Sequence, residues 1–437
     1  MTPKSARTPP PGHVVDEALG DTGRAPWGLV FFLVLIAVLN TLDRLLPGTL
    51  AEPIRKDLGL SDTALGIING YGFLLVYGIA AIPISKLADR GKYVSVITIS
   101  LGVWSCMTAL ASITRTGWQF GITRVGVALG EAGASPATHA FISHSFPPHL
   151  RARAMSTWAL SGPVGVMLGL IIGAYVGSEL GWRATFALMG LVGIVLTPIA
   201  AIVLGKYARR AHVGGLVEQQ SGRWTDLFRT RSGALIVLAA SMISTGIYAN
   251  VAFNPAFLMR AHGLSVAQAG IQLGLVTGLG GIPIVLAAGW IADVAARKDA
   301  RWTLRILAGV MMMSVPVLVA AYLVDNAIVA VVLLGIGAAG ISSYIPLTVL
   351  ALYRLVPVSA RARTSATLLL VNACFGGFGP LLVGMTSDAL SGSLGDQGLR
   401  YAMLVVPSLA LLGTLLYLMA SVTYRADIAR MLPKFSH

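Results

Sequence analysis

The chain has 437 residues, of which 55% are hydrophobic and only 11% are charged, and its mean hydropathy is +0.77. A soluble domain carries about 25% charged residues, so this composition excludes an ordinary soluble enzyme. Apolar runs of about 20 residues recur along the chain, each long enough to cross about 30 Å of hydrocarbon, and they predict an all-α membrane protein. The excess of 32 Lys and Arg over 18 Asp and Glu is explained by membrane topology, without a nucleic-acid partner.

Polar, proline-rich sequence fills the first 26 residues, and no apolar run precedes Trp27, so the segment does not resemble a cleavable signal peptide. It is predicted to be a disordered cytoplasmic tail. Beyond it, twelve apolar runs predict twelve membrane spans with boundaries good to about four residues. These spans cover 27–50, 62–86, 94–113, 118–141, 153–177, 183–205, 232–257, 264–292, 303–323, 327–353, 362–386 and 400–422.

The basic residues are distributed unevenly between the two sides of these spans. If the N-terminus is cytoplasmic, 24 of the 32 Lys and Arg fall on the cytoplasmic side and six on the other, while Arg44 and Arg124 lie within spans. Because basic residues favour the cytoplasmic side, both termini are expected inside, in a multi-pass protein of a bacterial inner (plasma) membrane.

The longest polar interruption, at 206–231, divides the spans six and six and reads as a cytoplasmic linker. An internal repeat supports two related halves, because Gly289-Trp-Ile-Ala-Asp293 after span eight echoes Ser85-Lys-Leu-Ala-Asp89 after span two. The expected units are a tail at 1–26, a six-helix bundle at 27–205, the linker, a second bundle at 232–422 and a tail at 423–437.

A second echo lies at the ends of spans four and ten. Pro147-Pro-His-Leu-Arg151-Ala-Arg153 aligns with Pro357-Val-Ser-Ala-Arg361-Ala-Arg363 at a constant offset. Two parallel six-helix repeats are the architecture of alternating-access transporters, which bind substrate between the halves near the middle of the membrane.

The first pair of echoed loops resembles the loop motif of the major facilitator superfamily, G-x-x-x-D-x-x-G-R-K/R. The copy with Asp293 and Arg297-Lys298 matches closely, while the copy with Asp89-Arg90 is one residue short before Gly91-Lys92. The resemblance covers essentially the whole chain and implies two pseudo-symmetric six-helix bundles that work by alternating access.

Further motifs resemble the Spinster-type branch of that superfamily, whose animal members transport lysophospholipids and sphingosine phosphate. They are Asn40-Thr-Leu-Asp43-Arg44, the stretch from Arg124 to Ala132 with Gly130-Glu131, Pro136 and Phe146-Pro-Pro148. The organic anion symporters share part of the span-four pattern. The resemblance therefore implies an amphiphilic lipid substrate and leaves a small organic anion as the alternative.

Four ionisable residues lie within apolar spans: Asp43, Arg44, Arg124 and Glu131. An ionised side chain at the centre of a membrane helix costs at least about 2.5–3.5 kcal/mol, so these residues must pair or face water. Depth along the helices places Asp43 roughly 24 Å from the cytoplasmic side and Arg124 roughly 9 Å from the outer side, which is nearly the same level. Glu131 follows Arg124 by two helical turns on the same face, and a chain of Asp43, Arg124 and Glu131 is predicted.

In this hypothesis, Glu131 couples transport to protons, with Asp43 and Arg124 tuning it. The alternative is that Glu131 and Arg124 only join the helices of the first half, and that Arg44 snorkels to the interface. Weaker candidates could bind a polar head group or form interhelical hydrogen bonds of about 0.6 kcal/mol each. They are Asn250, Asn254, Ser342, Tyr344 and Asn372.

The echoed loops also predict a cytoplasmic latch. Two acids, Asp89 and Asp293, would face basic residues on the same side of the membrane, and in the superfamily such loops hold the cytoplasmic side closed when the cavity opens outward. The basic members are Arg151, Arg153, Arg297, Arg361 and Arg363.

No enzymatic or cofactor chemistry is indicated. The sequence contains no phosphate-binding G-x-x-x-x-G-K-[ST] motif, and its seven His and two Cys do not cluster at metal-ligand spacing. Cys106 and Cys374 both lie in apolar runs and are expected to be buried thiols. No cofactor is expected.

The function predicted from the sequence is secondary active transport of amphiphilic lipids by a monomer, with protons as the coupling ion and with no nucleic-acid partner. The alternatives are a proton-coupled organic anion symporter, a hydrophobic drug exporter, and a membrane receptor or scaffold without transport.

Overall fold

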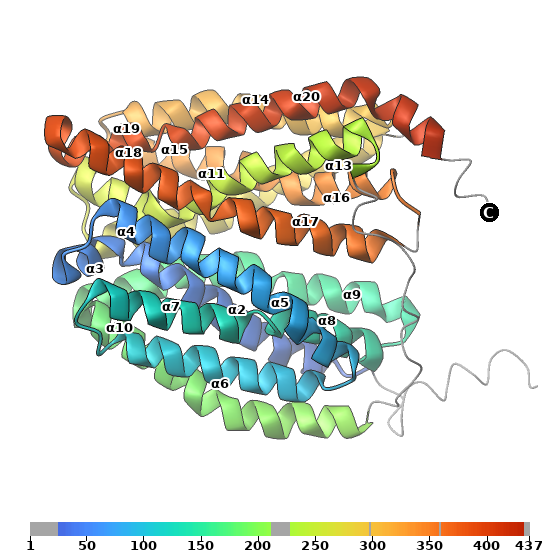
Figure 1. The fold of residues 1–437 in the computed structure, drawn as a ribbon, viewed down its shortest axis with the longest axis horizontal. Helices are drawn as coiled ribbons and strands as arrows, with labels where there is room; N and C mark the ends of the chain where they lie inside the picture. The colour runs from blue at the N-terminus through green and yellow to red at the C-terminus, as the bar shows by residue number, and fades with distance from the viewer. Residues whose placement is uncertain (1–24, 211–227, 297–298, 358–359, 432–437) are drawn as a thin grey trace, which may run out of the picture.

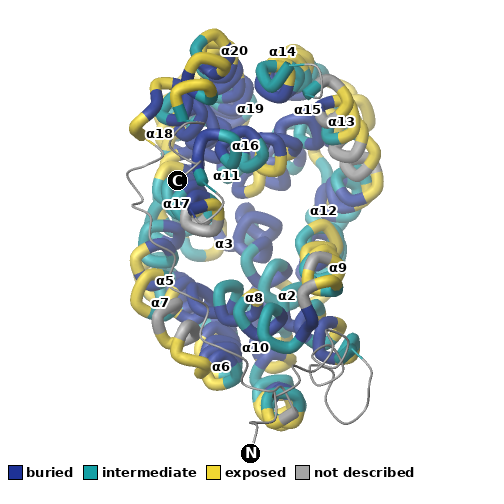
Figure 2. Tube along the Cα trace, turned by 90° about the vertical axis from the view of Figure 1, so that its right-hand side faces the viewer, coloured by how far each residue is buried: buried dark blue, intermediate teal, exposed yellow. Residues whose placement is uncertain are grey.

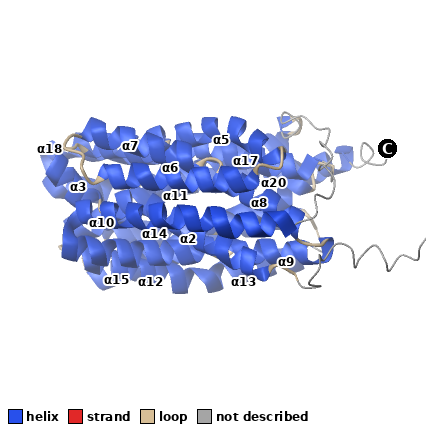
Figure 3. Cartoon of the chain, turned by 90° about the horizontal axis from the view of Figure 1, so that it is seen from below, coloured by secondary structure: helices blue, strands red, loops and turns tan. Residues whose placement is uncertain are grey.

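A computed structural model describes residues 25–210, 228–296, 299–357 and 360–431. Within these ranges the chain forms helices joined by short loops (Figure 3). The helices run nearly parallel to one long axis, and α2 begins at the end of the bundle at which α20 ends (Figure 1). The opposite end, which carries α3, α4 and η6, is called the distal end below.

The first half contains six crossings, several of them built from two consecutive helical segments. Its elements are α2 (Trp27–Thr49), α3 (Ala51–Leu58), α4 (Asp62–Gly66), η2 (Ile67–Gly72), α5 (Phe73–Asp89), α6 (Tyr93–Ala111), α7 (Gly117–Glu131), α8 (Ala134–Ser145), α9 (Pro148–Ala159) and α10 (Ser161–Arg210). The 50-residue α10 holds the end of the fifth crossing and the sixth, and it reverses direction at Gly181, whose φ of 78° is a conformation that favours glycine.

The second half repeats this pattern. Its elements are α11 (Arg231–His262), α12 (Val266–Leu275), η4 (Val276–Gly280), α13 (Gly281–Ala296), α14 (Arg301–Leu323), α15 (Ala327–Ser342), α16 (Tyr344–Tyr353), α17 (Arg361–Gly376), α18 (Phe378–Leu394), η6 (Gly395–Gln397), α19 (Gly398–Ala402) and α20 (Val405–Met431). The π-helical segments η2 and η4 occupy the second crossing of each half, and the echoed basic loops lead into α9 and α17, the fifth crossing of each half. The internal repeat is therefore structural.

Eight stretches of the described chain are long and apolar enough to span a membrane, and two of them, 149–209 and 367–431, are long enough for two crossings each. The remaining two crossings are the fourth, whose α7 carries Arg124 and Glu131, and the eighth, which η4 interrupts. These account for the twelve crossings predicted from the sequence, and the all-helical class is confirmed.

The two halves lie on opposite sides of a central axis and meet along two seams (Figure 2). Along one seam α18 packs on α4 and η2, and along the other α10 packs on α12 and η4. Glycines set the close approach, because a Cβ at Gly70 would lie 2.7 Å from the carbonyl oxygen of Gly377, and one at Gly274 would lie 3.1 Å from that of Met167. Small residues let membrane helices approach in this way.

Large apolar side chains remain exposed on the outward faces of the bundle, among them Ile99, Met313 and Val422. In a bilayer, lipid covers these positions. The expectation that both cysteines are buried was wrong for Cys106, which is exposed, while Cys374 is half-buried. An apolar run in a membrane protein does not distinguish a lipid-facing position from a packed one, because both surroundings are apolar.

Gly379 provides a test of helix packing in the second half. A Cβ at this position would overlap the carbonyl oxygen of Thr245 on α11, so Gly379→Ala must push α18 away from α11. We expect a loss of about 1–3 kcal/mol of stability, seen as a lower thermal midpoint in detergent.

The matched control lies on the same helix. A Cβ at Gly392 meets no atom within 4 Å, so Gly392→Ala should leave the midpoint unchanged or raise it slightly, because alanine favours a helix. Equal midpoints for the two variants would contradict the packing of α18 against α11.

Candidate functional site

The four charged residues predicted within spans lie on two neighbouring crossings of the first half. Asp43 and Arg44 are on α2, and Arg124 and Glu131 are on α7. Asp43, Arg124 and Glu131 are buried, whereas the Arg44 side chain keeps 30% of its surface accessible. Two acids and two bases give the cluster a net charge of zero, as burial in a membrane requires.

Asp43 lies beside Arg124, as the depth estimate from the sequence predicts. Nη1 of Arg124 is 3.6 Å from Oδ2 of Asp43, and the hydroxyl of Thr108 on α6 donates to Oδ1 of Asp43 at 2.7 Å. Thr108 is also buried. The carboxylate of Asp43 therefore joins α2, α6 and α7 inside the first half.

Glu131 binds Arg44 and forms no ion pair with Arg124, which differs from the predicted chain. The Nη2 and Nε atoms of Arg44 contact Oε2 of Glu131 at 2.5 and 3.0 Å. Helical side chains point back toward the N-terminus of their own helix, so Arg44 on α2 extends toward the level of Glu131. On the antiparallel α7, the same rule directs Arg124 toward the distal end and away from Glu131.

Arg44 therefore does not snorkel. Its guanidinium lies over two aromatic rings of α5, 4.9 Å from the centroid of Tyr77 and 5.6 Å from that of Phe73. Arg124 lies 5.2 Å from the centroid of the same Phe73 ring. Such cation–π contacts stabilise an arginine where water is scarce. Neither the aromatic pair nor Thr108 was singled out from the sequence, although the i, i+4 spacing of Phe73 and Tyr77 places both rings on one face.

The second half contributes to the surroundings of this cluster through Tyr248 of α11, which is half-buried and packs against the apolar core of the first half. Oε1 of Glu131 is buried and has no hydrogen-bond partner among the described residues. Glu131 thus combines one carboxylate oxygen bound to Arg44 with a second that is free to accept a hydrogen bond or a proton.

Polar candidates of the second half form two small networks. Asn254 donates to Asn250 within α11 and accepts a hydrogen bond from the hydroxyl of Tyr322 on α14 at 3.2 Å. The amide of Asn372 on α17 donates to the hydroxyl of Tyr344 on α16 at 3.3 Å, and its own Oδ1 is buried without a partner among the described residues. The first network joins helices, and the second retains an unused acceptor.

Ser342 belongs to neither network. Its hydroxyl donates to the backbone oxygen of Ala338 at 2.8 Å, within the same helix and on an exposed face. A hydroxyl bonded to its own helix in this way has its donor satisfied locally.

The predicted cytoplasmic latch lies only partly within the described structure. The side chains of Asp89, Asp293, Arg297 and Arg363 are outside the described residues. Arg151, Arg153 and Arg361 are exposed and contact groups of their own half, namely the carbonyl oxygen of Phe146 at 2.9 Å and the rings of Trp27 and Tyr353. The latch stays a prediction. Among the described residues, no group of three or more metal-ligating side chains occurs.

Two pseudo-symmetric six-helix bundles, the first of which holds a cluster of four charged side chains with no net charge, define a multi-pass membrane transporter. Residues 33–380 match the family model of the Major Facilitator Superfamily, and the chain belongs to this superfamily of secondary transporters. It is not an enzyme.

Several known proteins are similar to this chain. It is 39% identical to an MFS-type efflux pump of Mycolicibacterium smegmatis, over 93% of this chain and 95% of that protein. It is 26% identical to the protein spinster of Drosophila melanogaster, over 87% of this chain and 65% of that protein. The crystal structure of a bacterial homolog of the human lysosomal transporter Spinster, in an inward-facing and unoccupied conformation, matches with a TM-score of 0.83 at 24% identity, covering 92% of this chain and 99% of that one.

Proposed function

We propose that this protein is a proton-coupled transporter that exports amphiphilic molecules, with single-chain lipids such as lysophospholipids as the leading class. One observation carries the proposal: Glu131 is buried at membrane depth, is bound through one oxygen to the partly accessible Arg44, and leaves its other oxygen without a partner. A proton taken up on the free oxygen would remove the negative charge that Arg44 contacts.

The proposed coupling follows from charge balance. When Glu131 is ionised, it neutralises Arg44, and the cluster with Asp43 and Arg124 carries no net charge. When Glu131 takes up a proton, Arg44 loses its counter-ion and must find another anion or water. Proton uptake by Glu131 is thereby linked to a change in the partner that the accessible guanidinium of Arg44 binds.

Support for an amphiphilic substrate comes from the surroundings of Arg44 and from the relatives. The guanidinium lies against the rings of Phe73 and Tyr77, so an apolar wall adjoins the charged group. A charged group beside an apolar wall suits a molecule with a polar head and an apolar chain. The name of one relative, an efflux pump, supports export. The lipid class is what the resemblance of the motifs around Asp43 and Glu131 to the Spinster-type branch implies.

A small organic anion is the second candidate substrate. The accessible part of Arg44 favours it, because a guanidinium binds a carboxylate through two parallel hydrogen bonds. A hydrophobic drug would need no such group and would use only the aromatic wall.

Transport into proteoliposomes under an imposed pH gradient tests these classes against each other. The probes are a fluorescent lysophosphatidylcholine, ethidium and radiolabelled glucarate, with protein-free liposomes as the control. We expect proton-driven movement of the lysophospholipid that collapses when an ionophore removes the gradient. Movement of glucarate alone would overturn the amphiphile proposal, and lipid movement that ignores the gradient would overturn the coupling.

A further inference from the structure

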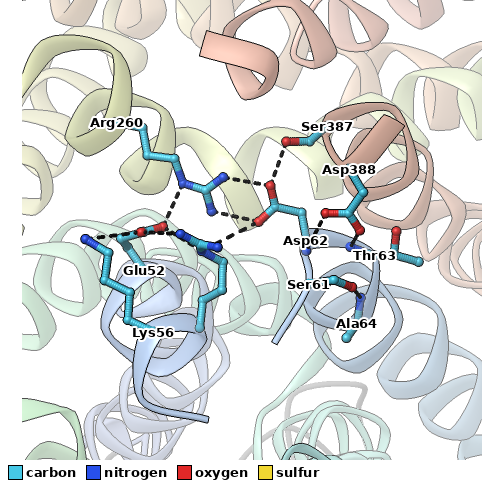
Figure 4. Close-up of polar contacts among 10 residues, drawn as sticks. Glu52, Lys56, Ser61, Asp62, Thr63, Ala64, Arg260, Ser387 and Asp388 are labelled. Carbon is cyan, nitrogen blue, oxygen red and sulfur yellow. Dashed lines mark hydrogen bonds and ion pairs between the residues drawn. The ribbon is translucent and has the colours of Figure 1, made fainter. Parts of the chain in front are cut away.

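A second cluster of buried charges lies at the distal end of the bundle, and Figure 4 shows its polar contacts. Glu52 lies in the first turn of α3, Asp62 is the first residue of α4, and Arg260 lies near the C-terminus of α11 in the other half. Gly59, with a φ of 62°, ends α3 and turns the chain so that the two acids converge. None of these three residues was predicted from the sequence as part of a functional site.

Arg260 binds both acids at once. Its Nε donates to Oε2 of Glu52 at 2.7 Å, and its Nη1 and Nη2 donate to the two carboxylate oxygens of Asp62, each at 2.7 Å. No more than 7% of any of these three side chains is exposed. Charge-assisted hydrogen bonds are about twice as strong as neutral ones, and the paired bonds to one carboxylate also fix the orientation of the guanidinium.

The corner between α3 and α4 is also held from α18, again across the boundary between the halves. The hydroxyl of Ser387 donates to Oδ2 of Asp62 at 2.6 Å. The carboxylate of Asp388 accepts the backbone N–H groups of Asp62 and Thr63 at 3.0 and 2.8 Å, next to the cap that Ser61 of the first half provides for α4. Asp62 is therefore held by both α11 and α18.

The backbones fit tightly beside these contacts. A Cβ at Gly384 on α18 would overlap the carbonyl oxygen of Asp62, and one at Gly66 would overlap that of Pro380. The halves touch here without intervening side chains. Opening the distal end requires these contacts to break together with the ion pairs.

Other ion pairs at the distal end stay within one half. Arg183 pairs with Asp57 in the first half, and Arg400 pairs with Asp325 in the second. At this end of the described structure, the ion pairs between the halves run only through Arg260. Nearby, Arg55 contacts Glu52 at 2.9 Å and Asp62 at 4.0 Å, and the exposed Lys56 contacts Glu52 at 3.5 Å.

The charge on Glu52 persists at every pH that a cell meets. Burial alone would raise the pKa of Glu52, but hydrogen bonds from Arg55 and Arg260 and the charges of both lower it to about 2. A depressed pKa means that the contact is complete above the ordinary glutamate value and is lost only as the pH falls toward about 2. The contact between Glu52 and Arg260 is therefore opened by moving the halves apart and not by protonating Glu52.

We propose that Arg260, gripped by Glu52 and Asp62, is the lock that holds the distal end of this transporter closed and that must open in each cycle. The acids belong to one rigid half and the arginine to the other, so a rocking motion of the halves breaks the lock in a single step. Loss of the contacts between Arg260 and the two acids should favour the state that is open at the distal end. The lock concerns the conformational equilibrium and does not depend on which substrate is carried.

Distances between spin labels across the distal face test this proposal. In a background with Cys106→Ser and Cys374→Ser, labels are attached at the exposed Arg115 of the first half and Gln397 of the second, each replaced by cysteine. We expect Arg260→Gln to raise the population with long label-to-label distances at least about threefold. Arg260→Lys keeps the charge but lacks the fork that holds both acids, and we expect an intermediate population.

The matched control is Arg183→Gln, which removes the same charge from the same face without crossing the boundary between the halves. It should leave the distance distribution as in the parent. Should Arg260→Gln fail to fold, Arg260→Lys carries the test alone. Parent-like distributions for the Arg260 variants, or equal opening by Arg183→Gln, would overturn the lock, whereas a transport defect without a change in distance would concern the proposed function only.

Discussion

Glu131→Gln is expected to reduce transport driven by a pH gradient at least about tenfold, while substrate exchange without a gradient continues. Glutamine keeps the shape of the side chain and can still accept a hydrogen bond from Arg44, but it cannot release or take up a proton. The measurement is a pair of proteoliposome assays, one with an imposed pH gradient and one with labelled substrate on one side and unlabelled substrate on the other.

Glu179→Gln is the matched control for this change, because Glu179 is an exposed acid on α10 with the same side chain. It should leave both assays unchanged. Loss of gradient-driven transport and of exchange together would indicate that Glu131 holds Arg44 in place for substrate binding. Full gradient-driven transport by Glu131→Gln would exclude Glu131 as the coupling residue.

The spans and the level of the buried charges were predictable from the sequence, for a simple reason. Hydrocarbon thickness sets the length of a crossing, and a fixed rise per residue then sets the depth of each side chain along it. Counting from Trp27 and from Trp118 therefore placed Asp43 and Arg124 at one level, and the structure pairs them at 3.6 Å.

Depth alone did not predict the partner of Glu131. Arg124 and Glu131 share a face of α7, but their side chains diverge along it, and Arg44 reaches Glu131 from α2. The relevant variable is side-chain direction, which depends on which neighbouring helix runs antiparallel and how it is rotated. A single sequence carries no direct record of that rotation.

The distal lock was missed for a different reason. Glu52 and Arg260 are separated by 208 positions, and both lie near span ends, where a charge ordinarily reports topology and contacts water. Only the folded arrangement shows that the ends of α3 and α11 meet and exclude solvent. A weak signal was present in Glu52 and Asp62, two acids on either side of a glycine turn.

Arg124→Ala is expected to destabilise the protein strongly. The change leaves Asp43 buried with only the hydroxyl of Thr108 as a partner, and removal of one member of a buried ion pair costs about 3–5 kcal/mol. Loss of the contact with the Phe73 ring adds to this cost. We expect the thermal midpoint in detergent to fall by at least about 5 °C.

A double variant separates the unpaired charge from the missing arginine itself. Combining Arg124→Ala with Asp43→Asn removes both charges, and the asparagine can still accept the hydrogen bond from Thr108, so we expect the double variant to regain at least about half of the lost stability. Asp43→Asn alone leaves Arg124 buried without its counter-ion and should also destabilise. If the stability loss of the double variant equals the sum of the two single losses, Asp43 and Arg124 are solvated independently of each other. The neutral cluster proposed to support proton coupling would then consist of Glu131 and Arg44 alone.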